Sequence, residues 1–87
     1  MFTQPEYRLL STLYFQTLRI VPGYVELKSV CTGHCWAIHK IAGSSKPIHL
    51  YHKHSESDRY YHFQYKCHSI KEAILEIKQH DNYFLSK

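Results

Sequence analysis

The sequence lacks several features that would assign it to a familiar class of protein. It has three cysteines, Cys31, Cys35 and Cys67, a low and odd number that does not suit the disulfide framework of a small secreted domain. No apolar stretch approaches the roughly 20 residues needed to span a bilayer. No basic segment followed by an apolar run resembles a signal peptide. These absences predict a cytoplasmic protein with no membrane partner.

Sequence signatures of catalysis are also missing. The chain has no glycine-rich phosphate loop, no paired-carboxylate arrangement and no nucleotide-binding motif. Cys35 and Cys67 each have a histidine nearby in the sequence, but a nucleophilic cysteine also needs an orienting third group. Free cysteine is among the residue types most often buried. The sequence therefore predicts a protein that is not an enzyme, with no catalytic residue and no cofactor.

The composition is that of one small folded domain. The chain has 87 residues, of which 44% are hydrophobic and 15% aromatic, so a folded core is expected rather than disorder. We predict a single domain over residues 1–87. The formal net charge is +4 with the eight histidines neutral, which favours anionic partners such as nucleic acid or an acidic protein surface.

The N-terminal segment has helical spacing. Thr3 and Glu6 are separated as in a capping box, and Pro5 stands in the first turn, where its missing N–H costs little. The apolar stripe that follows predicts a helix over residues 4–19, which ends before Pro22-Gly23. Phe15 falls outside this stripe.

The C-terminal segment predicts a second helix. Ser69 and Glu72 again have capping-box spacing, and isoleucines at helical intervals follow them. We expect the helix to run from residue 70 to about residue 80 and to stop at Asp81-Asn82. The apolar residues 83–85 then form a tail.

The first predicted hairpin joins strands over residues 24–30 and 35–41. Thr32-Gly33 suits a two-residue turn between them. The alternation of apolar and polar residues separates the side chains into two faces. The predicted core face carries Val25, Leu27, Ser29, Trp36 and Ile38.

The second predicted hairpin joins strands over residues 48–54 and 59–66 through a four-residue loop. Its predicted core face carries Ile48, Leu50, Tyr61, Phe63 and Tyr65, with His52 and His54 toward its end. The elements then follow the order α-β-β-β-β-α. This order predicts an α+β fold, a four-stranded antiparallel sheet flanked by an N-terminal and a C-terminal helix, with the helices on one face and the other face open.

Side chains on the open face suggest a first function. Aromatic rings stack on unpaired bases, and lysines neutralise phosphates, so an exposed sheet bearing both can bind single-stranded nucleic acid. Tyrosine and lysine also occupy exposed strands for cross-strand packing and solubility alone. The candidate nucleic-acid-binding residues are His49, Tyr51, Lys53, Tyr60, His62 and Lys66.

A protein partner is the alternative function. Apolar residues outside the predicted core favour association with another protein or with a second copy of the chain. The same side chains could instead close the edge of the core. The candidate interface residues are Phe15, Leu75, Tyr83, Phe84 and Leu85.

Metal binding through histidine is the third hypothesis. Cys31, His34, Cys35 and His39 lie close together in the sequence, but a structural zinc site usually needs two such pairs of ligands. The weak candidate ligands are His39, His49 and His62, which share the predicted open face. Dispersed surface histidines would produce the same pattern.

Overall fold

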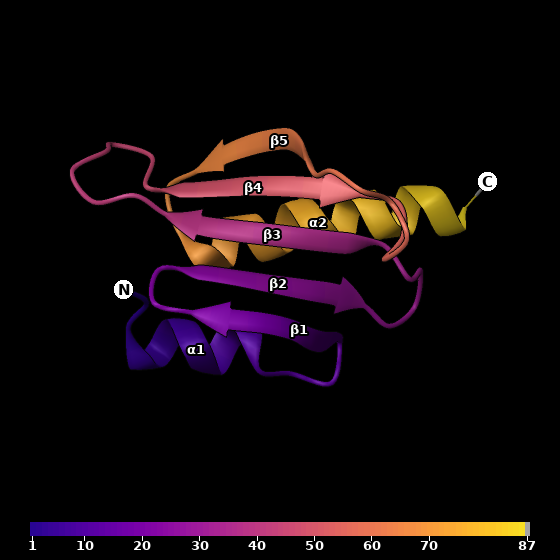
Figure 1. Ribbon diagram of the computed structural model, residues 1–87, viewed down its shortest axis with the longest axis horizontal. Helices are drawn as coiled ribbons and strands as arrows, with labels where there is room; N and C mark the ends of the chain where they lie inside the picture. The colour runs from indigo at the N-terminus through magenta and orange to yellow at the C-terminus, as the bar shows by residue number, and fades with distance from the viewer. Residues whose placement is uncertain (87) are drawn as a thin grey trace.

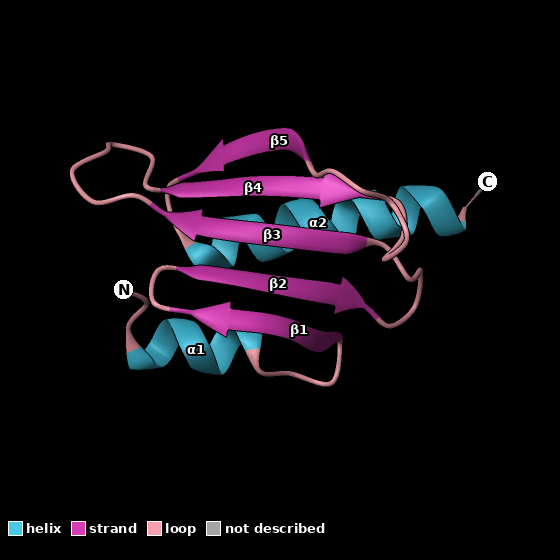
Figure 2. Cartoon of the chain, viewed as in Figure 1, coloured by secondary structure: helices cyan, strands magenta, loops and turns pink. Residues whose placement is uncertain are grey.

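The computed structural model of the chain describes residues 1–86, which form five strands and two helices (Figures 1 and 2). The strands build one antiparallel sheet in the order β1-β2-β3-β4-β5. The predicted α+β class with an antiparallel sheet and a helix at each end is confirmed, but the sheet has five strands and not four. In chain order the elements are α1 (Gln4–Leu10), β1 (Phe15–Val21), β2 (Tyr24–Ser29), β3 (Cys35–Lys40), β4 (Ile48–Lys53), β5 (His62–Cys67) and α2 (Ile70–Leu85).

The additional strand comes from the segment that was predicted to be one long helix. The capping box of Thr3 and Glu6 starts α1 as predicted, but the helix ends at Leu10 and the chain returns as β1. Residues 15–21 include three β-branched residues, which fit a strand better than a helix. Pro22-Gly23, with Gly23 at φ 75°, connects β1 to β2 as a tight turn. The prediction of a helix over residues 4–19 is therefore wrong.

The hairpin of β2 and β3 keeps the predicted faces. Val25 pairs with Ile38 and Leu27 pairs with Trp36, each two residues away from the partner that a turn at Thr32-Gly33 would give. The connection covers residues 30–34 and is longer than the predicted two residues. The difference in register is two residues, and side chains alternate with a period of two, so every residue stays on its predicted face. Val25, Leu27, Ser29, Trp36 and Ile38 are all buried.

The hairpin of β4 and β5 contains a register shift that moves part of β5 to the opposite face. Leu50 pairs with Tyr65, whereas the next residue, Tyr51, pairs with Phe63. The extra residue, Gln64, reverses the alternation beyond it. The prediction that Phe63 lies on the core face is therefore wrong, because it shares the opposite face with Tyr51.

Helix α2 continues past the predicted stop. Ser69 caps its N-terminus by accepting a hydrogen bond from the Glu72 backbone N–H, as predicted, but the helix runs to Leu85. Asp81 does not break it, because its side chain is fully buried and accepts hydrogen bonds from Tyr14 and Thr32. Among residues 1–86, no helix has the length and apolar character to cross a membrane.

The core lies between one face of the sheet and the helices. In Figure 1, α2 lies behind the sheet and α1 beside its β1 edge. Trp36, Ile38 and Leu50 from the sheet pack in one cluster with apolar residues of both helices: Leu10, Ile70, Ala73 and Ile77. We call this side of the sheet the helix side. The opposite side, without helices, is the open face.

Candidate functional site

The open face consists of three rows of side chains that run across the strands. Paired residues on neighbouring strands point to the same side of a sheet, so the pairings define each row. The first row is Val21, Tyr24, His39, His49 and Lys66. The second is Arg19, Glu26, Ala37, Tyr51 and Phe63. The third is Gln16, Lys28, Cys35 and Lys53.

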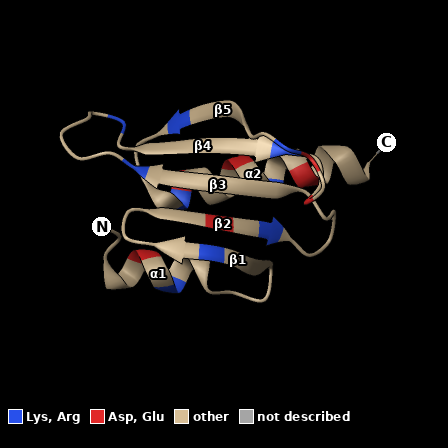
Figure 3. Ribbon diagram, viewed as in Figure 1, with Lys and Arg blue, Asp and Glu red and all other residues tan. Residues whose placement is uncertain are grey.

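Positive charge is distributed across the sheet. Each of the five strands carries one Lys or Arg, and Glu26 is the one acidic residue within the strands (Figure 3). Lys40 pairs with buried Ile48 on the helix side, where it contacts Glu6 at 2.7 Å. The other four cations belong to the open face. They are Arg19, Lys28, Lys53 and Lys66.

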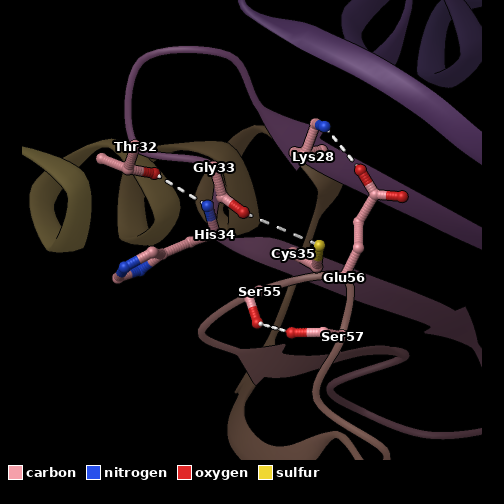
Figure 4. A network of polar contacts seen from close by, with 8 residues as sticks. All are labelled: Lys28, Thr32, Gly33, His34, Cys35, Ser55, Glu56 and Ser57. Carbon is pink, nitrogen blue, oxygen red and sulfur yellow. Dashed lines mark hydrogen bonds and ion pairs between the residues drawn. The ribbon is translucent and has the colours of Figure 1, made fainter.

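The loop between β4 and β5 covers one part of the open face. Glu56 of this loop pairs with Lys28 on β2 (Figure 4). The Tyr61 hydroxyl donates to Glu26 Oε1 at 3.0 Å, so the loop crosses from β4 to β2. Cys35 and Ala37 lie beneath it and are buried, although no helix covers this face. Tyr61 was predicted to lie on the core face, and its contact with Glu26 places it over the open face instead.

The remainder of the open face lies away from this loop and carries the rings of Tyr24, His39, His49, Tyr51 and Phe63. We call this region the aromatic half. Phe63 packs edge-to-face with Tyr51 at a ring-centroid distance of 5.6 Å and with His49 at 6.2 Å. Tyr24 and His39 form a similar pair at 6.1 Å. Phe63 lies on the edge strand β5 and is 54% exposed. Lys66 and Arg19, both exposed, lie on the same face.

Two tyrosines over the open face, Tyr24 and Tyr61, have raised pKa values. Burial, with the nearby Glu26 carboxylate, raises the pKa of Tyr24 to about 12. Burial and the hydrogen bond to Glu26 raise the pKa of Tyr61 as well. Tyr24 and Tyr61 therefore add no negative charge to the face at neutral pH.

Four of the six predicted nucleic-acid-binding residues share the open face. His49, Tyr51 and Lys53 lie on it from β4, and Lys66 lies opposite His49 on β5. Lys53 is drawn toward the loop, since its ammonium lies 4.6 Å from the centre of the Tyr61 ring. His62 pairs with His52 on the helix side because of the register shift in β5. Tyr60 lies in the loop and is 72% exposed.

The predicted metal ligands do not form one set. His39 and His49 are paired across β3 and β4 on the open face, but His62 lies on the helix side. Cys31 is exposed while Cys35 is buried under the loop. Burial raises the pKa of the Cys35 thiol, which therefore stays protonated at neutral pH.

The predicted interface residues divide in a similar way. Phe15 is 7% exposed and belongs to the core, because it faces the helix side as the first residue of β1. The other four extend along α2 as exposed side chains, since the apolar tail continues the helix. They are Leu75, Tyr83, Phe84 and Leu85.

A histidine cluster on the helix side was missed by the sequence analysis. His34, His52 and His80 come from the segment before β3, from β4 and from α2, and their rings are in contact. The one available signal was His52, whose alternation with apolar residues puts it on the predicted core face. A polar side chain in a core requires partners, but neither partner could be identified from spacing.

Comparison of the chain with protein-family models, with curated proteins and with solved structures finds no match. Function is therefore inferred from the geometry and charge of the described residues.

Proposed function

We propose that the protein binds single-stranded nucleic acid on the aromatic half of its open face. The observation that carries this proposal is the position of Phe63. Its exposed ring lies beside Tyr51 on a face whose strand residues carry four cations against one acidic side chain. An exposed Phe63 ring beside the half-buried Tyr51, with lysines and an arginine on the same face, suits a ligand that presents both flat rings and negative charge.

The two kinds of side chain have separate roles. Base stacking on an aromatic ring contributes about 1–3 kcal/mol per base and tolerates any sequence, because every base has a π-face. Lys66 and Arg19 lie at opposite edges of the sheet, on β5 and β1, where they can neutralise phosphates several nucleotides apart on a strand that crosses the sheet. The ligand is single-stranded, because bases in a duplex are stacked on each other and cannot reach Tyr51 or Phe63.

Binding of labelled single-stranded oligonucleotides at two salt concentrations tests the proposal. We expect saturable binding that weakens steeply as salt increases, because phosphate contacts release counterions. The double variant Tyr51→Ala/Phe63→Ala should lower affinity by about tenfold or more, since stacking is lost at two rings. Lys66→Gln should lower both the affinity and its salt dependence.

Matched controls lie on the other side of the sheet. Tyr83→Ala removes an exposed aromatic ring from α2, and Lys71→Gln removes an exposed lysine from the same helix. Both should bind as the unchanged protein does. Absence of binding at low salt, or equal losses in the controls and in the sheet-face variants, would contradict the proposal.

The exposed apolar side chains of α2 favour a second candidate function, self-association. Leu75, Phe84 and Leu85 are 56%, 47% and 55% exposed. A dimer that buried them would form independently of salt, since apolar contacts do not release counterions. Sedimentation at several protein concentrations tests this candidate. A monomer at every concentration would rule it out, and so would a dimer that persists in Leu85→Ser.

A further inference from the structure

Three histidines from distant parts of the sequence direct ring nitrogens toward one point on the helix side. One nitrogen from each of His34, His52 and His80 lies within 4.8 Å of those of the other two. The closest pair is His34 Nδ1 and His52 Nε2, at 3.1 Å. His34 and His52 are 4% and 5% exposed, so this pair is in the protein interior.

The surrounding elements fix the positions of these rings. His52 lies in the row of Leu27 and Trp36, and its ring packs against the Trp36 indole at 4.3 Å. The indole N–H donates to Ser29 Oγ at 3.1 Å, so Trp36 itself is anchored. Phe84 covers His34 from α2 at a ring-centroid distance of 4.5 Å. The extension of α2 beyond the predicted stop is therefore what closes the cluster.

The polar atoms of the cluster are incompletely satisfied. His80 Nδ1 is buried and has no hydrogen-bond partner among residues 1–86. The contact between His34 and His52 uses a single proton for two nitrogens, because one ring donates and the other accepts. Buried nitrogens without partners are uncommon in folded proteins, and one explanation is an ion that the structure does not contain.

The two buried histidines, His34 and His52, are neutral at pH 7, which is the form in which imidazole binds metal. Burial, together with smaller effects of the neighbouring His80, His34 and His54, lowers the pKa of His52 to about 4. Burial also lowers the pKa of His34, with smaller effects of His54 and His80. The buried Asp81 carboxylate next to His80 opposes these effects, so it favours a positive charge in the cluster.

We propose that His34, His52 and His80 bind one divalent transition-metal ion of the zinc class. Three imidazoles suit Zn²⁺, Cu²⁺, Ni²⁺ or Co²⁺, whereas Mg²⁺ and Ca²⁺ prefer oxygen ligands. This site lies on the opposite side of the sheet from the aromatic half, and the proposal does not depend on nucleic-acid binding.

The distances require only a small rearrangement. With Zn–N bonds of about 2.0–2.1 Å, two ligands of a tetrahedral ion lie about 3.3 Å apart. The pair His34 and His52 already has this separation, at 3.1 Å, and the third nitrogen needs to approach by at most about 1.5 Å from 4.8 Å. The proton between His34 Nδ1 and His52 Nε2 must also move away to make room for the ion. It can move to the other nitrogen of the same ring, which leaves that ring neutral.

Three ligands leave the fourth tetrahedral position open. His54 lies beside the cluster without being one of the three converging ligands, and its exposed ring stacks on His34 with a centroid distance of 5.2 Å and an interplanar angle of 5°. A water molecule is a fourth ligand that the site allows.

The experiment uses the full chain, freed of metal by a chelator that is then removed. Titration with Zn²⁺ in a calorimeter should give one ion per chain. Co²⁺ should give the visible absorption bands of a four-coordinate ion. His80→Gln should weaken Zn²⁺ binding by about 100-fold or more, because even the loss of a residue that only supports a ligand costs about 10–100-fold.

His68→Gln is the matched control. His68 is an exposed histidine just before α2, at the opposite end of the helix from His80. The His68→Gln variant should bind Zn²⁺ as tightly as the unchanged protein does. If a variant at position 34, 52 or 80 does not fold, NMR of the histidine ring nitrogens in the unchanged chain decides the matter. Zn²⁺ should shift His34, His52 and His80 together, while His68 stays constant.

Several outcomes would overturn the proposal. They are the absence of saturable Zn²⁺ binding, binding that His80→Gln leaves unchanged, and Zn²⁺-induced shifts confined to His39 and His49. The last result would assign the ion to the open face.

Discussion

The two sides of strand β4 perform different tasks with alternate residues of one short sequence. Tyr51 and Lys53 point to the open face, where their surroundings are solvent and a loop. Leu50 and His52 point to the helix side, where they are buried among Trp36 and the residues of α2. A substitution on one side leaves the other side chains in place, because neighbouring residues of a strand do not share a face.

The difference separates binding from stability. On the helix side, inward-facing side chains of β2, β3 and β4, such as Leu27, Trp36 and Leu50, are fully buried, so a change in one of them affects the packing of the core. On the open face, Phe63 can be truncated with little loss of packing, since half of its surface already meets solvent. The proposed metal ligands lie on the packed helix side, whereas the proposed stacking residues lie on the open face.

Leu27→Ala should have the largest effect. Leu27 is fully buried on the helix side, and truncation leaves a cavity that costs about 2–5 kcal/mol. Such a loss is a large fraction of the stability of a small domain. Urea unfolding followed by circular dichroism measures it, with Phe63→Ala as the control on the open face. Equal losses in the two variants would remove the distinction between the two sides.

Acidification of the metal-free protein should destabilise it through His52. Its pKa is about 4 in the folded chain against 6.5 in the unfolded chain, mainly because of burial. The unfolded chain binds a proton in this window and the folded chain does not, so stability is complete above pH 6.5 and decreases toward pH 4. At pH 4 the free energy of unfolding should be lower by about 3 kcal/mol than above pH 6.5.

Urea unfolding between pH 7.5 and pH 4.5, with NMR titration of the His52 ring, measures this effect. His34, His54 and His80 also face His52, and Asp81 acts on it with the opposite sign, so the ring must be observed individually. A His52 ring that titrates near 6.5 would show that it is not buried as described.

Tyr14→Phe should have an intermediate effect at the junction of the N- and C-terminal segments. The Tyr14 hydroxyl donates to Asp81 Oδ2 at 2.6 Å, and its removal leaves a buried carboxylate with one donor fewer. We expect a loss of about 1–3 kcal/mol in the free energy of unfolding. Tyr7→Phe, on the same side but away from Asp81, is the control. A loss no greater than that of the control would contradict a role for this hydrogen bond.

The sequence predicted the faces of the sheet better than its strands. The alternation of Val25, Leu27 and Trp36 was sufficient because a register error of two residues does not change a face. The same logic failed at Phe63, because a single extra residue reverses a face and no residue type marks its position. The segment of β1 fits both helical and strand spacing, and pairing with β2 decides between them.

The histidine cluster shows a second limit of sequence reasoning. His34, His52 and His80 have no common spacing, and the prediction ended the second helix before the turn that carries Phe84. Asp81 looks like a helix terminator by residue type, yet the hydroxyls of Tyr14 and Thr32 satisfy it inside the protein. Those partners lie in distant segments, so the local sequence could not indicate that Asp81 would be buried.

The register shifts at the two edges of the sheet also affect how copies of the chain meet. Both outer strands have one, between Thr17 and Arg19 in β1 and opposite Leu50 and Tyr51 in β5. A regular edge offers an unbroken ladder of backbone donors and acceptors on which another chain can add a strand. Here the ladder is interrupted at each edge, so a sixth strand from another copy would lose hydrogen bonds at the interruption. The irregularity that brings Phe63 to the open face thus also protects the chain against edge-to-edge aggregation.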